Sequence, residues 1–107
     1  MNGKVDKPAR LEVWRLRYGK RLVLNVQSDL LDISTFVVIP LARPGSFDRV
    51  DEVNPQVEVS GTTYLLVTQQ LSAVRRSDMR TRVADLSSDS GMVIKKLFVD
   101  VRRLFLL

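Results

Sequence analysis

The chain has 107 residues, 45% of them hydrophobic, which fits one small domain with an apolar core of its own. It contains neither cysteine nor histidine, so disulfides, thiolate chemistry and the usual zinc sites are excluded, and catalysis by a nucleophile–base pair is disfavoured. The balance of 17 Lys and Arg against 12 Asp and Glu gives a net charge of +5. That charge favours a nucleic acid or an acidic protein as partner, although it equally serves solubility alone.

No apolar run reaches the length of about eighteen residues that a membrane span needs. The first eight residues have no apolar segment of the kind that secretory signals carry. We therefore expect a cytoplasmic protein without a membrane span, which acts by binding another macromolecule, with no catalytic residues, no metal and no cofactor. Residues 1–10 are expected to form a flexible lead-in, and residues 11–107 the domain.

A β-hairpin is predicted at the start of the domain. Residues 11–18 alternate, with Trp14, Leu16 and Tyr18 on one face, which we expect to be buried, and with arginines on the other. Gly19 and Lys20 supply a tight turn, because glycine accepts a positive φ at little cost. Residues 21–27 alternate again and complete the hairpin. In this second strand Leu22, Leu24 and Val26 are expected to face inward, and Asn25 and Gln27 outward.

Two further β segments follow. Residues 28–32 break the alternation with serine and aspartates, which favour turns. Residues 36–39 are apolar throughout, which predicts a strand covered on both sides and ended by Pro40. Residues 56–60 and 63–69 alternate on either side of the pair Gly61 and Thr62, which predicts a second hairpin.

An amphipathic helix is predicted at the C-terminus. The polar residues 87–90 offer several N-caps. Beyond them apolar side chains recur at steps of three and four, while charged residues occupy the other side. The apolar positions are Ile94, Leu97, Phe98, Val101, Leu104 and Phe105.

Four segments resemble the CcdB toxins. The run LNVQSDLLD at 24–32 and VIPL at 38–41 look like the second and third strands of that family. Asn54-Pro55 before the second hairpin and VADLS at 83–87 before the final helix are similar as well. The order and approximate spacing agree, and the resemblance extends over roughly residues 11 to 104.

The resemblance implies a mainly β fold, a small SH3-like β-barrel with a C-terminal α-helix that CcdB shares with the MazF ribonucleases. It also implies a homodimer and a type II toxin–antitoxin module, in which a CcdA-like antitoxin neutralises the toxin through a disordered segment. CcdB toxins bind the A subunit of DNA gyrase and trap the cleaved-DNA complex. They use no cofactor and no catalytic residues.

Candidate target-binding residues come from the same resemblance. Leu30 and Leu31 match two isoleucines of the target-facing surface, and adjacent apolar residues in a turn are themselves typical of a contact patch. CcdB proteins end in Trp-Gly-Ile. A register continued without a gap places Arg102, Arg103 and Leu104 there, whereas alignment by the chain end places Phe105, Leu106 and Leu107 there. The candidates are therefore Leu30, Leu31, Val101, Arg102, Arg103, Leu104, Phe105, Leu106 and Leu107.

Two alternatives remain open on the same fold. In a MazF-like endoribonuclease, arginines near a dimer groove would hold RNA phosphates and assist cleavage. The cluster available for that role is Arg75, Arg76, Arg80 and Arg82, although the pattern favours a solvated charge run over an RNA contact. The second alternative is a CcdB relative that does not poison gyrase and only binds an antitoxin.

Overall fold

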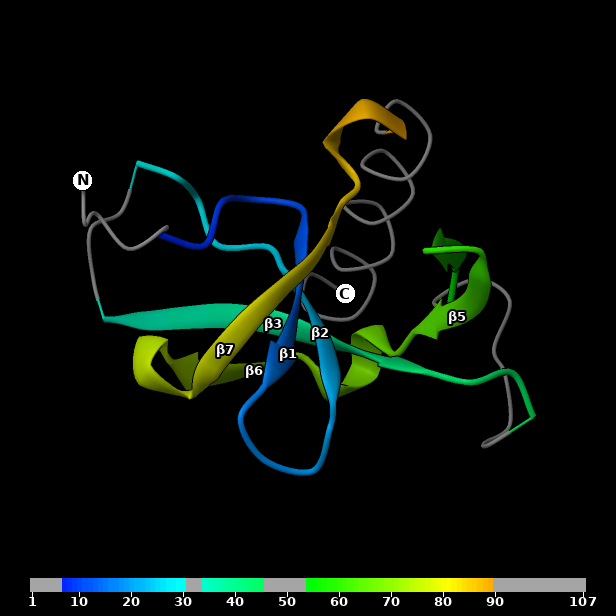
Figure 1. Cartoon of the computed structure of the whole chain (residues 1–107), viewed down its shortest axis with the longest axis horizontal. Helices are drawn as coiled ribbons and strands as arrows, with labels where there is room; N and C mark the ends of the chain where they lie inside the picture. The colour runs from blue at the N-terminus through cyan, green and yellow to red at the C-terminus, as the bar shows by residue number, and fades with distance from the viewer. Residues whose placement is uncertain (1–6, 31–33, 46–53, 90–107) are drawn as a thin grey trace, which may run out of the picture.

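The computed structural model describes residues 7–30, 34–45 and 54–89, and within them the fold is mainly β (Figure 1). Three short 3-10 turns, η1 (Thr68–Gln70), η2 (Arg76–Asp78) and η3 (Ser87–Asp89), join or follow the strands. The strands are β1 (Glu12–Leu16), β2 (Leu22–Asn25), β3 (Thr35–Ala42), β4 (Gln56–Val59), β5 (Thr62–Leu66), β6 (Ser72–Arg75) and β7 (Met79–Asp85).

The strands form one antiparallel sheet in the order β4-β5-β3-β2-β1-β7, with β6 also paired to β3. Figure 1 shows β3 running along the molecule, with β2, β1 and β7 crossing its middle and β5 near one end. The long β3 pairs with β6 along its first half and with β5 at its end, which lets the sheet curl. In the described part of the chain β4 and β7 each pair on one side, so the predicted barrel is an open half-barrel.

Both predicted hairpins are present, and each closes through two residues with positive φ. Gly19 and Lys20 have φ of 67° and 49°, and Ser60 and Gly61 have φ of 51° and 82°. In the second hairpin these two residues are the whole turn, because Val59 pairs with Thr62, and two consecutive positive φ angles match the twist of antiparallel strands. In the first hairpin the N–H of Leu16 donates to the carbonyl of Arg21, so the loop is residues 17–20 and is longer than predicted. The second turn lies one residue earlier than predicted.

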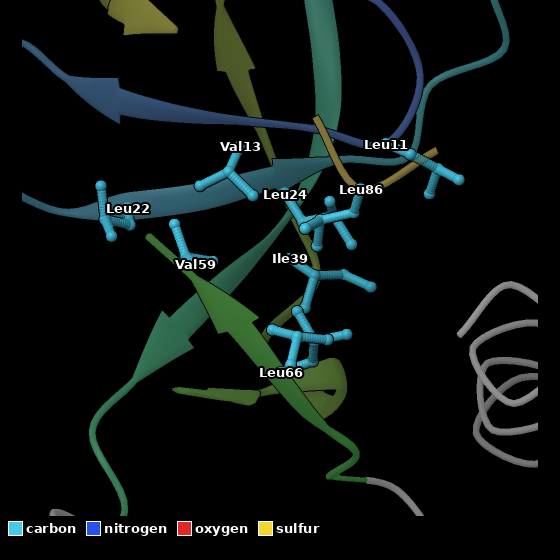
Figure 2. Close-up of a cluster of buried hydrophobic side chains, with 9 residues drawn as sticks. Leu11, Val13, Leu22, Leu24, Ile39, Val59, Leu66 and Leu86 are labelled. Carbon is cyan, nitrogen blue, oxygen red and sulfur yellow. The ribbon is translucent and has the colours of Figure 1, made fainter. Parts of the chain in front are cut away.

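Two apolar clusters cover the sheet, and β1, β2 and β3 contribute to both. The larger cluster contains Leu11, Val13, Leu22, Leu24, Ile39, Val57, Val59, Leu66 and Leu86. Figure 2 shows its side chains gathered between β1–β2 and the strand that carries Leu66. The smaller cluster contains Trp14, Leu16, Val23, Phe36, Val38 and Met79. Burial on two sides explains why β2 is buried at all four positions.

Several sequence-based predictions differ from the structure. Asn25 and Gln27 were expected to face solvent, yet they are 0% and 5% exposed. Tyr18 was expected in the core with Trp14, but it lies beyond the end of β1 and is 47% exposed. Strand β3 continues past Pro40 to Ala42. Pro40 lies between the stretches that pair with β6 and β5, where a missing N–H is tolerated.

The predicted helix over residues 94–105 lies outside the described residues, as do residues 1–6 of the lead-in. At the end of the lead-in Pro8 is fully buried. Among the residues that the structure describes, no helix is long and apolar enough to cross a membrane.

Candidate functional site

Leu30 lies in a turn and is 93% exposed. Its backbone N–H donates to Ser28 Oγ at 3.2 Å, and the backbone N–H of Arg10 donates to Asp29 Oδ1 at 2.8 Å. The turn residues thus use their side chains to shape the backbone, as serine and aspartate do in turns. The apolar side chain of Leu30 is therefore exposed to solvent on a turn whose backbone is held by hydrogen bonds.

Two buried amides, Asn25 and Gln27, lie just before this turn. Asn25 Nδ2 donates to the carbonyls of Pro8 and Ala9 at 3.3 and 3.0 Å, and Asn25 Oδ1 accepts from the N–H of Gln27 at 3.0 Å. Gln27 Oε1 accepts from the N–H of Val37 at 3.3 Å. Buried polar groups need such partners, which explains why two polar residues stand where an apolar core would be expected. These bonds connect the segment that leads into the turn to residues 8–9 and to β3.

The other predicted target-binding residues lie outside the described part of the chain. These are Leu31 and the C-terminal set Val101, Arg102, Arg103, Leu104, Phe105, Leu106 and Leu107. Whether they join Leu30 on one surface stays a prediction.

Asp78 lies at the centre of one half of the predicted arginine cluster. It is 6% exposed and accepts from Arg17 Nε at 2.7 Å on Oδ1, with Arg75 Nε at 3.6 Å from Oδ2. The hydrogen bond from Arg17 and its charge, followed by the charge of Arg75, hold the pKa of the Asp78 carboxyl below its ordinary value. The same bond raises the pKa of the Arg17 guanidinium.

Trp14 and Glu12 contact the other arginines of the cluster, Arg76 and Arg82. Glu12 Oε1 accepts from Trp14 Nε1 at 3.0 Å, and Arg82 Nη1 lies 3.3 Å from Glu12 Oε2. The Arg76 guanidinium lies 5.2 Å from the centre of the Trp14 ring and also donates to the carbonyl of Met79. Three of the four arginines therefore contact a carboxylate or a ring of the protein itself. The fourth, Arg80, is exposed on β7.

A metal centre has no support in the part of the chain that the structure describes, where no three acidic side chains gather. The chain has no histidine or cysteine anywhere. Hydrogen bonds from Ser87 hold the pKa of Asp85 below its ordinary value, as Arg17 does for Asp78, so neither carboxylate is suited to accept a proton near neutral pH.

The ionised Asp78 carboxylate should stabilise the fold at neutral pH and lose that effect in acid. A carboxyl whose pKa is lower in the folded state stabilises the fold above its ordinary pKa, here 3.8, and loses that effect as the pH falls through the lowered value. Asp78→Asn should therefore lower the Tm at neutral pH, and its deficit should shrink as the pH drops below about 4. Circular dichroism melts from neutral pH to strong acid test this. Parallel curves for the two proteins would contradict it, because Asp85 contributes equally to both.

The structure also brings together cations that the sequence did not single out as a site. Arg15, Lys20, Arg21 and Arg43 line one groove between the two hairpins. Arg43 lies 28 residues from Arg15, so no local pattern could have joined them. The sequence could have indicated part of this groove, because Arg15, Lys20 and Arg21 lie close together around the predicted turn of the first hairpin.

Comparison with known proteins gives the fold and the family. An endoribonuclease in complex with its cognate antitoxin, from a mycobacterial species, is 14% identical with a TM-score of 0.73, covering 91% of this chain and 93% of that one. A second mycobacterial endoribonuclease is 13% identical with a TM-score of 0.72, covering 92% and 90%. At such identities the likeness shows a shared fold. No curated protein sequence matches the chain.

The family model described as CcdB protein matches residues 11–99, which include every described strand. That match agrees with the resemblance carried by the four sequence segments. The chain belongs to the CcdB family of toxins from toxin–antitoxin modules.

Proposed function

We propose that this protein poisons DNA gyrase by binding its A subunit, and that it acts by contact rather than by catalysis. The observation that carries the proposal is Leu30, an apolar residue 93% exposed on a hydrogen-bonded turn. Exposed apolar groups of this kind act as anchors at protein interfaces. Leu30 is also the position that the CcdB resemblance assigns to the target-facing surface.

The remaining partners follow from the same proposal. The toxin would work as a homodimer in the cytoplasm, held inactive by a CcdA-like antitoxin. One of the fold neighbours is itself in complex with its cognate antitoxin, which supports such a partner. A twofold pair is the commonest assembly for a small domain, and light scattering at micromolar concentration should give twice the chain mass.

Titration of the gyrase A dimerisation domain with the purified protein tests the proposal. We expect saturable binding, seen by calorimetry, at one toxin dimer per domain dimer. The proposal would be overturned if, at the highest soluble concentration, calorimetry recorded no heat and gel filtration of the mixture showed no shift in elution volume. The antitoxin should abolish the signal if it covers the same surface.

A MazF-like endoribonuclease is the second candidate, because both fold neighbours named above are endoribonucleases. Its predicted RNA contacts are Arg75, Arg76, Arg80 and Arg82. Asp78 and Glu12 neutralise part of their charge, and Arg76 lies over Trp14. An arginine already engaged by a carboxylate has less charge to offer a phosphate. The geometry therefore favours the binding toxin over the ribonuclease.

Single-stranded RNA incubated with the purified protein should stay intact. The physical reason is that the described site has no general base matched to neutral pH and its arginines are largely engaged. Denaturing gels of end-labelled RNA measure the result. Site-specific cleavage that disappears in Arg80→Ala or Arg82→Ala, with the Tm preserved, would replace the binding toxin by the ribonuclease.

A further inference from the structure

The chain makes a tight turn over residues 9–12, at the start of β1. The N–H of Glu12 donates to the carbonyl of Ala9 at 3.1 Å, which closes the turn. Leu11, the third residue of the turn, has a φ of 70°, whereas Arg10 before it is not among the residues with a positive φ. That combination is the pattern of a type II turn, whose second position suits proline and whose third position is usually glycine or asparagine. A leucine at the third position is therefore in a strained conformation.

The apolar core and the neighbouring backbone hold Leu11 in that conformation. Its side chain is 4% exposed and packs within the larger apolar cluster (Figure 2). Its N–H donates to the carbonyl of Asn25 at 2.7 Å, and its carbonyl accepts from the N–H of Leu86 at 2.9 Å. A strained residue persists only where its surroundings fix it, and such residues gather where geometry serves function.

Glu12 and Asn25 fix the rest of the turn to the sheet. The Glu12 carboxylate, itself 6% exposed, accepts from the N–H of Ala9 at 2.8 Å as well as from the Trp14 indole. The Asn25 amide donates to the carbonyls of Ala9 and of Pro8, which is fully buried. The turn is therefore a rigid part of the domain, with hydrogen bonds to β1, to β2 and to the residue that follows β7.

One backbone group of this rigid turn reaches the residue next to Leu30. The N–H of Arg10 donates to Asp29 Oδ1 at 2.8 Å, although the two residues are 19 positions apart. Figure 1 shows the two segments side by side, residues 7–11 in blue and residues 26–30 in cyan. Among the described residues this hydrogen bond joins residues 28–30 to a distant part of the chain, whereas the bond between Leu30 and Ser28 stays within their own turn.

Leu30 needs such a support because its side chain is exposed and has little packing of its own. A loop that moves freely must be ordered when it binds a partner, and that ordering reduces affinity. A turn that is already held in its bound conformation avoids the loss.

We propose that the turn at residues 9–12 positions Leu30 for its target, and that the Arg10 N–H and the Asp29 carboxylate are the positioning pair. The inference rests on the proposed function, because it names what holds the target-binding residue in place. Neither group has to touch the target. The turn supplies a fixed donor, the buried Leu11 keeps the turn from moving, and Asp29 passes the constraint to Leu30.

The first test removes the donor. Arg10→Pro deletes the N–H and is compatible with the turn, since proline suits the second position of a type II turn. Arg10→Ala is the matched control, because it removes the same side chain but keeps the N–H. We expect Arg10→Pro to lower the ¹⁵N order parameter of the Leu30 amide and to weaken binding to the gyrase A dimerisation domain about fivefold. Arg10→Ala should leave both as in the wild type.

The second test removes the acceptor. Asp29→Ala should match Arg10→Pro, and the combined variant should lose no more than either variant alone. Asp29→Asn keeps a side-chain oxygen that can accept from the Arg10 N–H, so it should restore most of the order and the affinity. Asp29 is exposed, so these variants should keep the Tm of the wild type. Asp29→Ala therefore decides the matter if Arg10→Pro fails to fold.

Three results would overturn the proposal. An unchanged order parameter at Leu30 in both Arg10→Pro and Asp29→Ala would show that other contacts hold the turn. Equal losses in Arg10→Pro and Arg10→Ala would assign the effect to the arginine side chain. An Asp29→Asn variant as weak as Asp29→Ala would mean that the charge of Asp29 itself contacts the target. If the wild type does not bind the gyrase domain, the proposed function fails, while the order parameter of Leu30 still decides whether this pair positions the turn.

Discussion

Replacing Trp14 by alanine should lower the free energy of unfolding by about 3–5 kcal/mol, a large share of the total stability of a small domain. Trp14 is 3% exposed within the smaller apolar cluster, where it packs with Val23, Phe36 and Val38. Its indole N–H also donates to Glu12 Oε1, and its ring supports Arg76. The substitution therefore leaves a cavity and removes a hydrogen bond from a buried carboxylate.

Urea denaturation followed by circular dichroism measures this effect. Trp14→Phe should cost less, because most of the packing remains and only the N–H is lost. Tyr18→Ala is the matched control. This aromatic residue follows the same strand but is 47% exposed, so its loss should cost about 1 kcal/mol or less. A larger effect for Tyr18→Ala than for Trp14→Ala would contradict the assignment of Trp14 to the core.

Leu30→Asp should weaken binding to the gyrase A dimerisation domain by roughly thirtyfold, the equivalent of about 2 kcal/mol for one interface anchor. The new carboxylate would be desolvated in the interface without a partner, and the apolar contact would be lost. Because the side chain is 93% exposed in the free protein, the Tm should stay unchanged.

Calorimetric titrations of the gyrase A dimerisation domain with the variant and with the wild type give the ratio of the two affinities. Tyr18→Asp makes the same kind of change at the other large apolar residue exposed in the described chain, which lies in the loop of the β1–β2 hairpin. It should bind gyrase A as the wild type does. Equal affinities for Leu30→Asp and the wild type would remove the turn from the target surface.

The sequence predicted the hairpins well because their cause is local. Gly19 and Gly61 permit the positive φ that a tight turn needs, and alternation on either side marks the strands. The prediction for residues 21–27 was right for the inward face but wrong for Asn25 and Gln27, which were expected to face outward. Alternation assumes one covered face, whereas β2 lies between two apolar clusters and buries Asn25 through bonds to Pro8 and Ala9.

The candidate site, too, was predictable from the sequence only where the cause is local. Exposure of Leu30 agrees with what two leucines among turn-forming residues indicate, because neighbouring apolar side chains in a turn are hard to bury together. The partners of the arginines were not predictable. Arg17 reaches Asp78 across 61 residues of sequence, and that contact exists only because β1 and β7 pair. Strands β6 and β7 were themselves missed, since their polar residues do not alternate clearly.

The most direct test of the central claim is a gyrase cleavage assay on supercoiled DNA. Gyrase is incubated with the DNA and the purified protein, the complexes are denatured and digested with protease, and linear DNA is quantified on a gel. We predict that linear DNA accumulates with the wild type and with Tyr18→Asp, and falls sharply with Leu30→Asp. No linear DNA at any concentration of the wild type, alongside cleavage of single-stranded RNA by the same preparation, would contradict the account and establish the ribonuclease instead.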